Sequence, residues 1–247
     1  MVIVLEGRPS GVGHETYDAA VEASTNLMEG ISNRTEFCFK YLETRRNLTG
    51  ASIHNGVSTG NGLLKPSYVN PHPHGYIVDH LQQQHCFQTL ASYGDGMCFL
   101  LHLEMWAPDL YHLYANYLLP FWQDNPELVK HLPYPNNSIF PAATYNFGPA
   151  QSDKHLDLLN VPYGFCDIGA LGKFGAVQGH LVLCDLCIII QFPAGSQILL
   201  PSTILFHSFT QYCAGIFRWT DAGHKLEKDL LGDEKDNNSV VSVRGLD

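Results

Sequence analysis

The chain has 247 residues, of which 45% are hydrophobic and 11% aromatic, a composition that indicates a folded domain and excludes a disordered chain. Its formal net charge of −10 gives no general attraction to nucleic acid, although a local basic face on an acidic protein would remain compatible with DNA. The best local cluster is Lys40, Arg45 and Arg46, and so few charges favour an ordinary solvated surface. No apolar run suffices for a membrane-spanning helix, residues 1–8 lack the pattern of a secretory signal, and seven cysteines, an odd number, indicate reduced thiols. We therefore expect an intracellular protein without membrane contact, and a monomer.

The first half of the chain carries mainly helical patterns. Gly30 is expected to end the first helix, and Pro108 to begin the longest one, because proline suits a first helical turn. Residues 47–75 are rich in turn signals, among them the pair Asn55-Gly56, and are expected to form loops. In chain order we expect a strand at 2–5, helices at 15–29, at 76–90 and from 108, and a short helical turn at 126–132.

From residue 139 onward the pattern changes to short β-rich runs separated by glycine and proline. The expected strands lie at 142–147, 163–171, 180–192, 196–200, 203–206 and 209–213. So many closely spaced strands predict a sandwich or jelly roll, with the preceding helices packed on its outside. We therefore predict an α+β chain with one domain over 1–224, helical and loop-rich to 138 and β-rich from 139, followed by a charged, flexible tail over 225–247.

The chemistry-bearing residues are His155, Asp157 and His207. On a strand, residues two apart point to the same side, so His155 and Asp157 could both reach one ion. A His-x-Asp spacing alone is close to what chance gives in this composition, but here it opens the β-rich half, and His207 ends a predicted strand about fifty residues later. Two imidazoles and one carboxylate are the ligand set that holds Fe(II) on one face and leaves the other face open.

Longer runs around these residues resemble a known family. They are Phe140-Pro-Ala-Ala-Thr-Tyr-Asn-Phe-Gly-Pro149, His155-Leu-Asp-Leu-Leu-Asn-Val-Pro-Tyr-Gly164, Gly179-His-Leu-Val-Leu-Cys-Asp-Leu186, Phe192-Pro-Ala-Gly-Ser196, Leu200-Pro-Ser202, Phe209-Thr-Gln-Tyr212 and Phe217-Arg-Trp219. Together they resemble the TET/JBP-like (ten-eleven-translocation and base-J-binding-protein) DNA dioxygenases, in particular fungal, transposon-associated members. The resemblance covers about residues 2–224 and is strongest from 139 to 219.

The resemblance implies a fold, a reaction and residue roles. The fold is a double-stranded β-helix, or jelly roll, and the cofactors are Fe(II) and 2-oxoglutarate. The reaction is stepwise oxidation of 5-methylcytosine in DNA, a step of DNA demethylation that needs a flipped-out base and implies a nuclear location. His155, Asp157 and His207 fall on the metal-ligand positions, and Asn160 and Tyr212 on positions that contact or pack near the target base.

The chain departs from the family pattern directly after His207. Family members have a turn with proline and glycine there, and then a strand that starts with an arginine, which binds the far carboxylate of 2-oxoglutarate as a bidentate fork. Here His207 passes directly into Ser208-Phe-Thr-Gln-Tyr212, and a basic residue expected near 97–98 is also missing. Arg218 could substitute as the anchor. The alternatives are therefore a degenerate, non-catalytic relative, or an iron and 2-oxoglutarate hydroxylase of another substrate.

The same departure can be stated from the residues alone. Between Thr203 and Ala214 no Gly, Pro, Asn or Asp would reverse the chain, so two adjacent antiparallel strands cannot form there without a costly turn. Either the last strand is displaced or the chain reverses at Ser208.

For two further motifs the sequence favours an ordinary structural role over a functional site. His72, His74, His80 and His85 favour a solvated loop over a zinc site. Cys184 and Cys187 would lie on opposite faces of a strand, which disfavours a paired thiol site.

Overall fold

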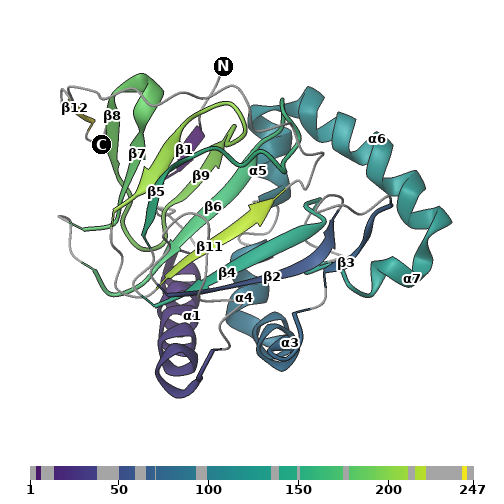
Figure 1. Cartoon of the computed structure of the whole chain (residues 1–247), viewed down its shortest axis with the longest axis horizontal. Coiled ribbons are helices and arrows are strands. Elements are labelled where there is room, and N and C mark those ends of the chain that lie inside the picture. Colours follow the sequence, from purple (N-terminus) through teal and green to yellow (C-terminus); the bar gives the residue numbers. More distant parts are fainter. Residues whose placement is uncertain are drawn as a thin grey trace.

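The computed structural model describes residues 4–6, 14–37, 50–58, 65–69, 71–92, 99–134, 139–148, 151–174, 178–210, 215–220 and 241–243. Its strands form two sheets (Figure 1). The larger sheet has the order β1 (Val4–Glu6), β9 (Gln197–Leu200), β6 (Cys166–Leu171), β11 (Gly215–Thr220), β4 (Ala142–Phe147), β2 (Ala51–Ser58) and β3 (Ser67–Val69). The smaller sheet has the order β12 (Val241–Val243), β8 (Ile188–Gln191), β7 (His180–Leu183), β10 (His207–Phe209) and β5 (Ser152–His155).

The chain crosses repeatedly between the two sheets. From β4 to β11 the strands fall in the larger sheet, the smaller, the larger, twice the smaller, then the larger, the smaller and the larger again. The strand pairs are antiparallel except for β12 and β8. This alternation makes β5 and β10 neighbours, although about fifty residues separate them in the sequence.

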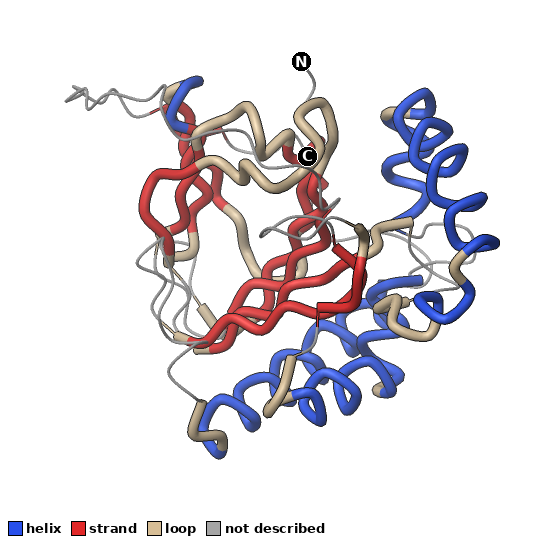
Figure 2. Tube along the Cα trace, turned by 45° about the vertical axis from the view of Figure 1, so that its right-hand side comes forward, coloured by secondary structure: helices blue, strands red, loops and turns tan. Residues whose placement is uncertain are grey.

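Helices cover the outer face of the larger sheet (Figure 2). They are α1 (His14–Arg34), α3 (Gly75–Gln83) and α4 (His85–Ser92), while α5 (Phe99–Trp106), α6 (Pro108–Asp124) and α7 (Pro126–Val129) lie to one side. The buried Tyr145 and Phe147 of β4 pack in this helix–sheet core with Phe87. Because side chains alternate along a strand, Thr144 and Asn146 turn to the other face, toward the space between the sheets.

A second core fills the space between the two sheets. It joins Ile168 and Leu200 of the larger sheet to Leu183 and Phe209 of the smaller sheet, together with Phe192. All five side chains are buried, so the two sheets enclose an apolar interior next to the first residue of β10. The expected mixed α+β architecture is confirmed.

Several predicted boundaries in the helical half were wrong. Helix α1 continues through Gly30 to Arg34, and the single helix expected at 76–90 is divided into α3 and α4 by the extended backbone of Gln84. Helix α5 was not expected. The region 47–75 contains β2, and its Asn55-Gly56 pair lies inside that strand because Gly56 has a φ of +120° and packs closely against the Pro141 carbonyl.

The β-rich half follows the sequence more closely. Strand β4 has the predicted bounds, but the run at 180–192 is interrupted by a 3₁₀ turn, η1 (Cys184–Leu186), and residues 203–206 form a turn rather than a strand. The chain does not reverse at Ser208, which lies inside β10, and the next described strand, β11, is displaced to the other sheet. Of the expected tail, the structure describes only Val241–Val243, which form β12 beside β8.

Candidate metal centre

The two histidines come from neighbouring strands. His155 is the last residue of β5 and His207 is the first residue of β10, and the two are register partners in this antiparallel pair. Residues directly opposite one another in such a pair carry their side chains on the same face. The two imidazole rings accordingly meet, with centroids 4.3 Å apart and planes inclined by 51°.

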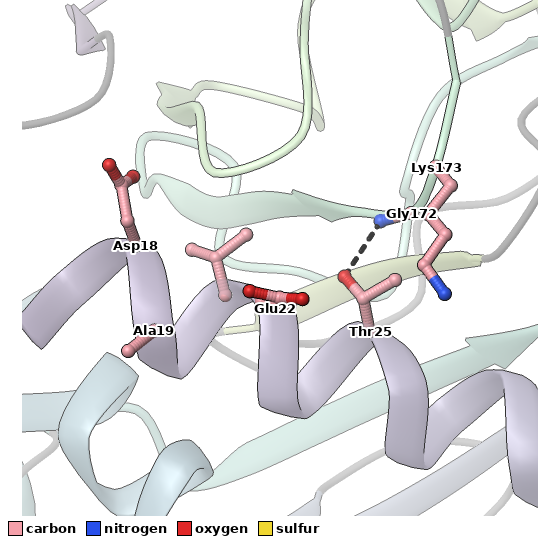
Figure 3. Close-up of a pocket in the computed structure, with 7 residues that line it drawn as sticks. Asp18, Ala19, Glu22, Thr25, Gly172 and Lys173 are labelled. Carbon is pink, nitrogen blue, oxygen red and sulfur yellow. Dashed lines mark hydrogen bonds between the residues drawn. The ribbon is translucent and has the colours of Figure 1, made fainter. Parts of the chain in front are cut away.

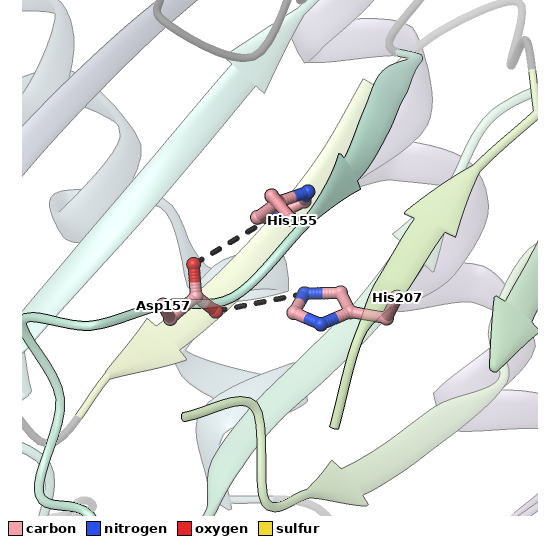
Figure 4. Close-up of side chains that lie close together, drawn as sticks. All are labelled: His155, Asp157 and His207. Atoms are coloured by element: carbon pink, nitrogen blue, oxygen red, sulfur yellow. Dashed lines mark ion pairs between the residues drawn. The ribbon is translucent and has the colours of Figure 1, made fainter. Parts of the chain in front are cut away.

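Asp157 reaches the same point from a loop rather than from the strand. Strand β5 ends at His155, so the expected two-residue alternation along one strand does not explain the arrangement. Instead, the Asp157 N–H donates to the Ser202 carbonyl at 2.9 Å, which turns the carboxylate toward the rings. Its Oδ1 lies 3.7 Å from His155 Nε2, and its Oδ2 lies 3.6 Å from His207 Nε2 (Figure 4).

Backbone carbonyls orient both imidazoles. His155 Nδ1 lies 2.7 Å from the Asp153 carbonyl oxygen, and His207 Nδ1 lies 2.9 Å from the Leu205 carbonyl oxygen. Since a carbonyl can only accept, each Nδ1 must carry the proton and donate it. In the neutral rings the Nε2 lone pairs therefore point toward Asp157, which is the tautomer that metal-binding histidines adopt.

The three side chains differ in their access to water. His207 is completely buried, Asp157 is 3% exposed, and the His155 side chain is 11% exposed. A nearly dry carboxylate between two imidazoles is costly unless a cation or proton compensates its charge. The cluster opens to solvent on the His155 side, which is where a further ligand could enter.

The donor set fits a divalent transition metal. One ligand atom from each of His155, Asp157 and His207 lies within 4.8 Å of the others, and within the described ranges this is the one group of three or more His, Cys, Asp or Glu side chains so arranged. Ligands bound at about 2.1 Å and at right angles lie about 3 Å apart, so metal binding requires all three side chains to move inward. Two nitrogens and one carboxylate on one side match the facial arrangement used for Fe(II).

Comparison with known proteins gives little beyond this geometry. No protein-family model matches the chain, and no curated protein matches it. Among solved structures, NgTET1 in complex with 5mC DNA is similar over 90% of this chain and 75% of that chain, with 12% identity and a TM-score of 0.48. At that identity and TM-score, the likeness supports no shared reaction or substrate.

Of the remaining predicted site residues, the structure describes Asn160 and Arg218 but not Tyr212. Asn160 is buried below the Asp157 loop, where its side-chain nitrogen contacts Cys166 and Ser202. Arg218 lies on β11 in register with Thr144 and Ile168. Tyr212 lies outside the described residues, as do Lys40, Arg45, Arg46 and residues 97–98. Asn160, Tyr212 and Arg218 therefore stay predictions.

Two motifs judged unimportant can be placed. The histidines of the 72–85 region form no shared group among the described side chains: His74 packs against Phe37, and His80 contacts Gln84. Cys184 and Cys187 are free thiols, but the expectation that they lie on opposite faces of a strand was wrong. They belong to the 3₁₀ turn η1 and its cap, and in a 3₁₀ turn residues three apart lie on the same side.

The sequence did not reveal the residues that hold the centre together. Ser202 and Thr203 belong to a segment expected to include a strand, and Cys166 was part of an apolar run. The hydrogen bonds from Ser202 and Thr203 to the Asp157 loop join residues about forty positions apart, a pairing that no local pattern encodes. Within the described residues, no helix is long and apolar enough to cross a membrane.

Proposed function

We propose that the chain is an Fe(II)- and 2-oxoglutarate-dependent dioxygenase of the TET/JBP-like type, which oxidises 5-methylcytosine in DNA. The observation that carries this proposal is the convergence of His155, Asp157 and His207 in a buried, open-sided arrangement. The sequence resemblance supplies the substrate and the family, including its fungal, transposon-associated branch and a nuclear location.

The strand order supports a double-stranded β-helix. Strands β4 to β11 alternate between two facing sheets, and β5 and β10 meet where that fold places its metal ligands. We propose that residues 1–224 form one dioxygenase domain, a monomer in solution.

The chain's own residues would prepare the site in three ways. His155 and His207 present Nε2 lone pairs fixed by their Nδ1 hydrogen bonds, and Asp157 supplies one negative charge. The buried side chains of the inter-sheet core exclude water from the His207 side, with Phe209 edge-on to its ring at 6.2 Å between centroids. Fe(II), when bound together with 2-oxoglutarate, supplies the O2-activating chemistry, with succinate and CO2 as co-products.

Arg218 is the proposed partner of the far carboxylate of 2-oxoglutarate. It occupies the register position between Thr144 and Ile168, and both of these face the space between the sheets. A guanidinium is suited to this task because its donors match a carboxylate bidentately. Asn160 and Tyr212 are proposed to contact or pack near the flipped base.

A second candidate is a degenerate relative that binds metal without turning over 2-oxoglutarate. The observation in its favour is that Phe209 still belongs to β10, so the segment that in the family follows the arginine on a separate strand here extends the His207 strand. An iron and 2-oxoglutarate hydroxylase of another substrate is a third reading, which the net charge of −10 favours over a DNA enzyme.

One set of measurements separates these functions. Calorimetry with Mn(II) and then 2-oxoglutarate tests the metal and the co-substrate in turn, and incubation of methylated duplex DNA with Fe(II) and 2-oxoglutarate tests the reaction by mass spectrometry of the nucleosides. Oxidised 5-methylcytosine that depends on both additions supports the dioxygenase. Metal binding without co-substrate binding supports the degenerate relative. Succinate formation without any change in DNA supports another substrate.

A further inference from the structure

The loop that carries Asp157 is fastened to the turn that follows β9. Asp157 N–H donates to the Ser202 carbonyl at 2.9 Å, and the Thr203 hydroxyl donates to the Val161 carbonyl at 3.1 Å and lies 3.5 Å from the Asp157 carbonyl. Ser202 and Thr203 are themselves buried. The backbone on both sides of the metal-binding carboxylate is therefore held by one short segment.

A buried polar cluster lies beneath the same loop. Asn160 Nδ2 donates to Ser202 Oγ at 3.0 Å and to Cys166 Sγ at 2.6 Å, and Ser202 Oγ lies 2.9 Å from Cys166 Sγ. The Asn160 N–H in turn donates to the Asp157 carbonyl at 3.0 Å. Buried groups of this kind are costly when one partner is lost, so the cluster fixes the position of Asn160 relative to β6.

We infer that Ser202 is a positioning residue of the metal centre, acting on Asp157 through its carbonyl directly and through its hydroxyl by way of Asn160. The inference rests on the proposed function, because it assigns a role relative to the metal that His155, Asp157 and His207 would bind. It also gives Asn160 a role before any contact with a base. Both protons of its side-chain amide are committed to Ser202 and Cys166, so a base contact would have to use the carboxamide oxygen.

The physical reason is the geometry that a shared ion demands. The carboxylate oxygens lie 3.7 and 3.6 Å from two Nε2 atoms whose rings are oriented by backbone carbonyls, and a shared ion draws the ligand atoms to about 3 Å from one another. A loop that is free to rotate would place Asp157 over a wide range of positions, and metal affinity would fall even with all three ligands present. Groups that orient ligands in this way are typically worth about 10- to 100-fold in metal affinity.

The test is Mn(II) affinity, measured by electron paramagnetic resonance of free Mn(II), together with the melting temperature. Ser202→Ala removes the hydroxyl and keeps the main-chain bond, and we expect it to weaken Mn(II) binding about 10-fold or more. The matched control is Thr25→Val, which removes a buried hydroxyl on α1 that accepts the Gly172 N–H at 3.1 Å (Figure 3). It is expected to lower the melting temperature while leaving the Mn(II) affinity within about twofold.

A double-mutant cycle adds a second readout. If Ser202 acts through Asn160, then Asn160→Ala weakens Mn(II) binding as well, and the double variant loses little more than the larger single loss. If Ser202→Ala does not fold, the Mn(II) affinity of Asn160→Ala tests the inference in its place.

The outcomes distinguish this inference from the proposed function. Wild-type protein that binds no Mn(II) overturns the metal centre and the inference together. Wild-type protein that binds Mn(II), with both variants unchanged in affinity and lower in melting temperature, leaves the metal centre standing and overturns the positioning role alone.

Discussion

Asp157→Asn is the sharpest test of the metal centre, because it changes charge and almost nothing else. The asparagine side chain has the same shape, so the packing around position 157 is preserved, while the one negative charge between two imidazoles is removed. Asp157 is 3% exposed, so in the metal-free protein its charge is held almost entirely out of water. We therefore expect the variant to be at least as stable as the wild type without metal, and less stable than the wild type with metal.

The magnitude follows from linkage between binding and folding. At a free metal concentration of 100 times the dissociation constant, binding stabilises the wild type by about 2.7 kcal/mol. If the loss of one of three ligands weakens binding about 100-fold, the same concentration stabilises the variant by about 0.4 kcal/mol. For a chain of this size each kcal/mol shifts the melting temperature by about 2–4 °C, so we expect shifts of about 5–11 °C for the wild type and about 1–2 °C for the variant.

The assay is differential scanning fluorimetry with and without Mn(II), which avoids the oxidation of Fe(II) in air. Asp79→Asn on the exposed face of α3 is the matched control, since it removes one carboxylate far from the three ligands. It should keep the full Mn(II)-dependent shift. If Asp157→Asn retains that shift too, the carboxylate does not bind the ion, and the proposed centre is wrong.

Three further predictions address the surroundings of the site. Arg218→Met is expected to weaken 2-oxoglutarate binding by 10-fold or more, roughly the loss of a bidentate ion pair, with Mn(II) affinity unchanged; calorimetry checks it, and equal co-substrate affinity would remove Arg218 from the site. Asp185→Ala removes the carboxylate that accepts the Phe206 N–H at 2.7 Å, directly before His207, and should weaken Mn(II) binding severalfold with little change in melting temperature; unchanged affinity would refute a role for η1 in orienting His207. Burial raises the pKa of Tyr134 well above its usual value, so its stabilising contribution is present below about pH 10 and is lost as pH rises further. Tyr134→Phe should therefore lose less of its urea midpoint between about pH 8 and pH 11 than the wild type, and an equal loss would contradict this.

The sequence indicated which three side chains lie together better than it indicated how they meet. His155, Asp157 and His207 could be chosen because the sequence shows the residue types, their spacing and the strand patterns around them. Their convergence depends on β5 pairing with β10 and on Ser202 binding the Asp157 loop, and both pairings join segments more than forty residues apart. Local patterns failed for the same reason at Asn55-Gly56, where a sheet neighbour converts a turn signal into strand.

The position of each part in the fold explains why the proposed metal binding and the proposed co-substrate binding can be tested separately. His155, Asp157 and His207, the proposed metal ligands, come from β5, its following loop and β10, and the loop is tied to the 201–203 turn and, through Asn160 and Cys166, to the start of β6. Arg218 lies on β11, in the middle of the larger sheet, and reaches its register with β4 and β6 only after the chain has left β10. The proposed shortening of the segment after His207 would therefore leave His155, Asp157 and His207 together while changing where the next strand begins. If that change has displaced the anchor, the protein will bind Mn(II) with the affinity expected of three ligands and will show no saturable binding of 2-oxoglutarate. If Arg218 binds the far carboxylate instead, the protein will bind both Mn(II) and 2-oxoglutarate, and loss of Arg218 will weaken only the binding of 2-oxoglutarate.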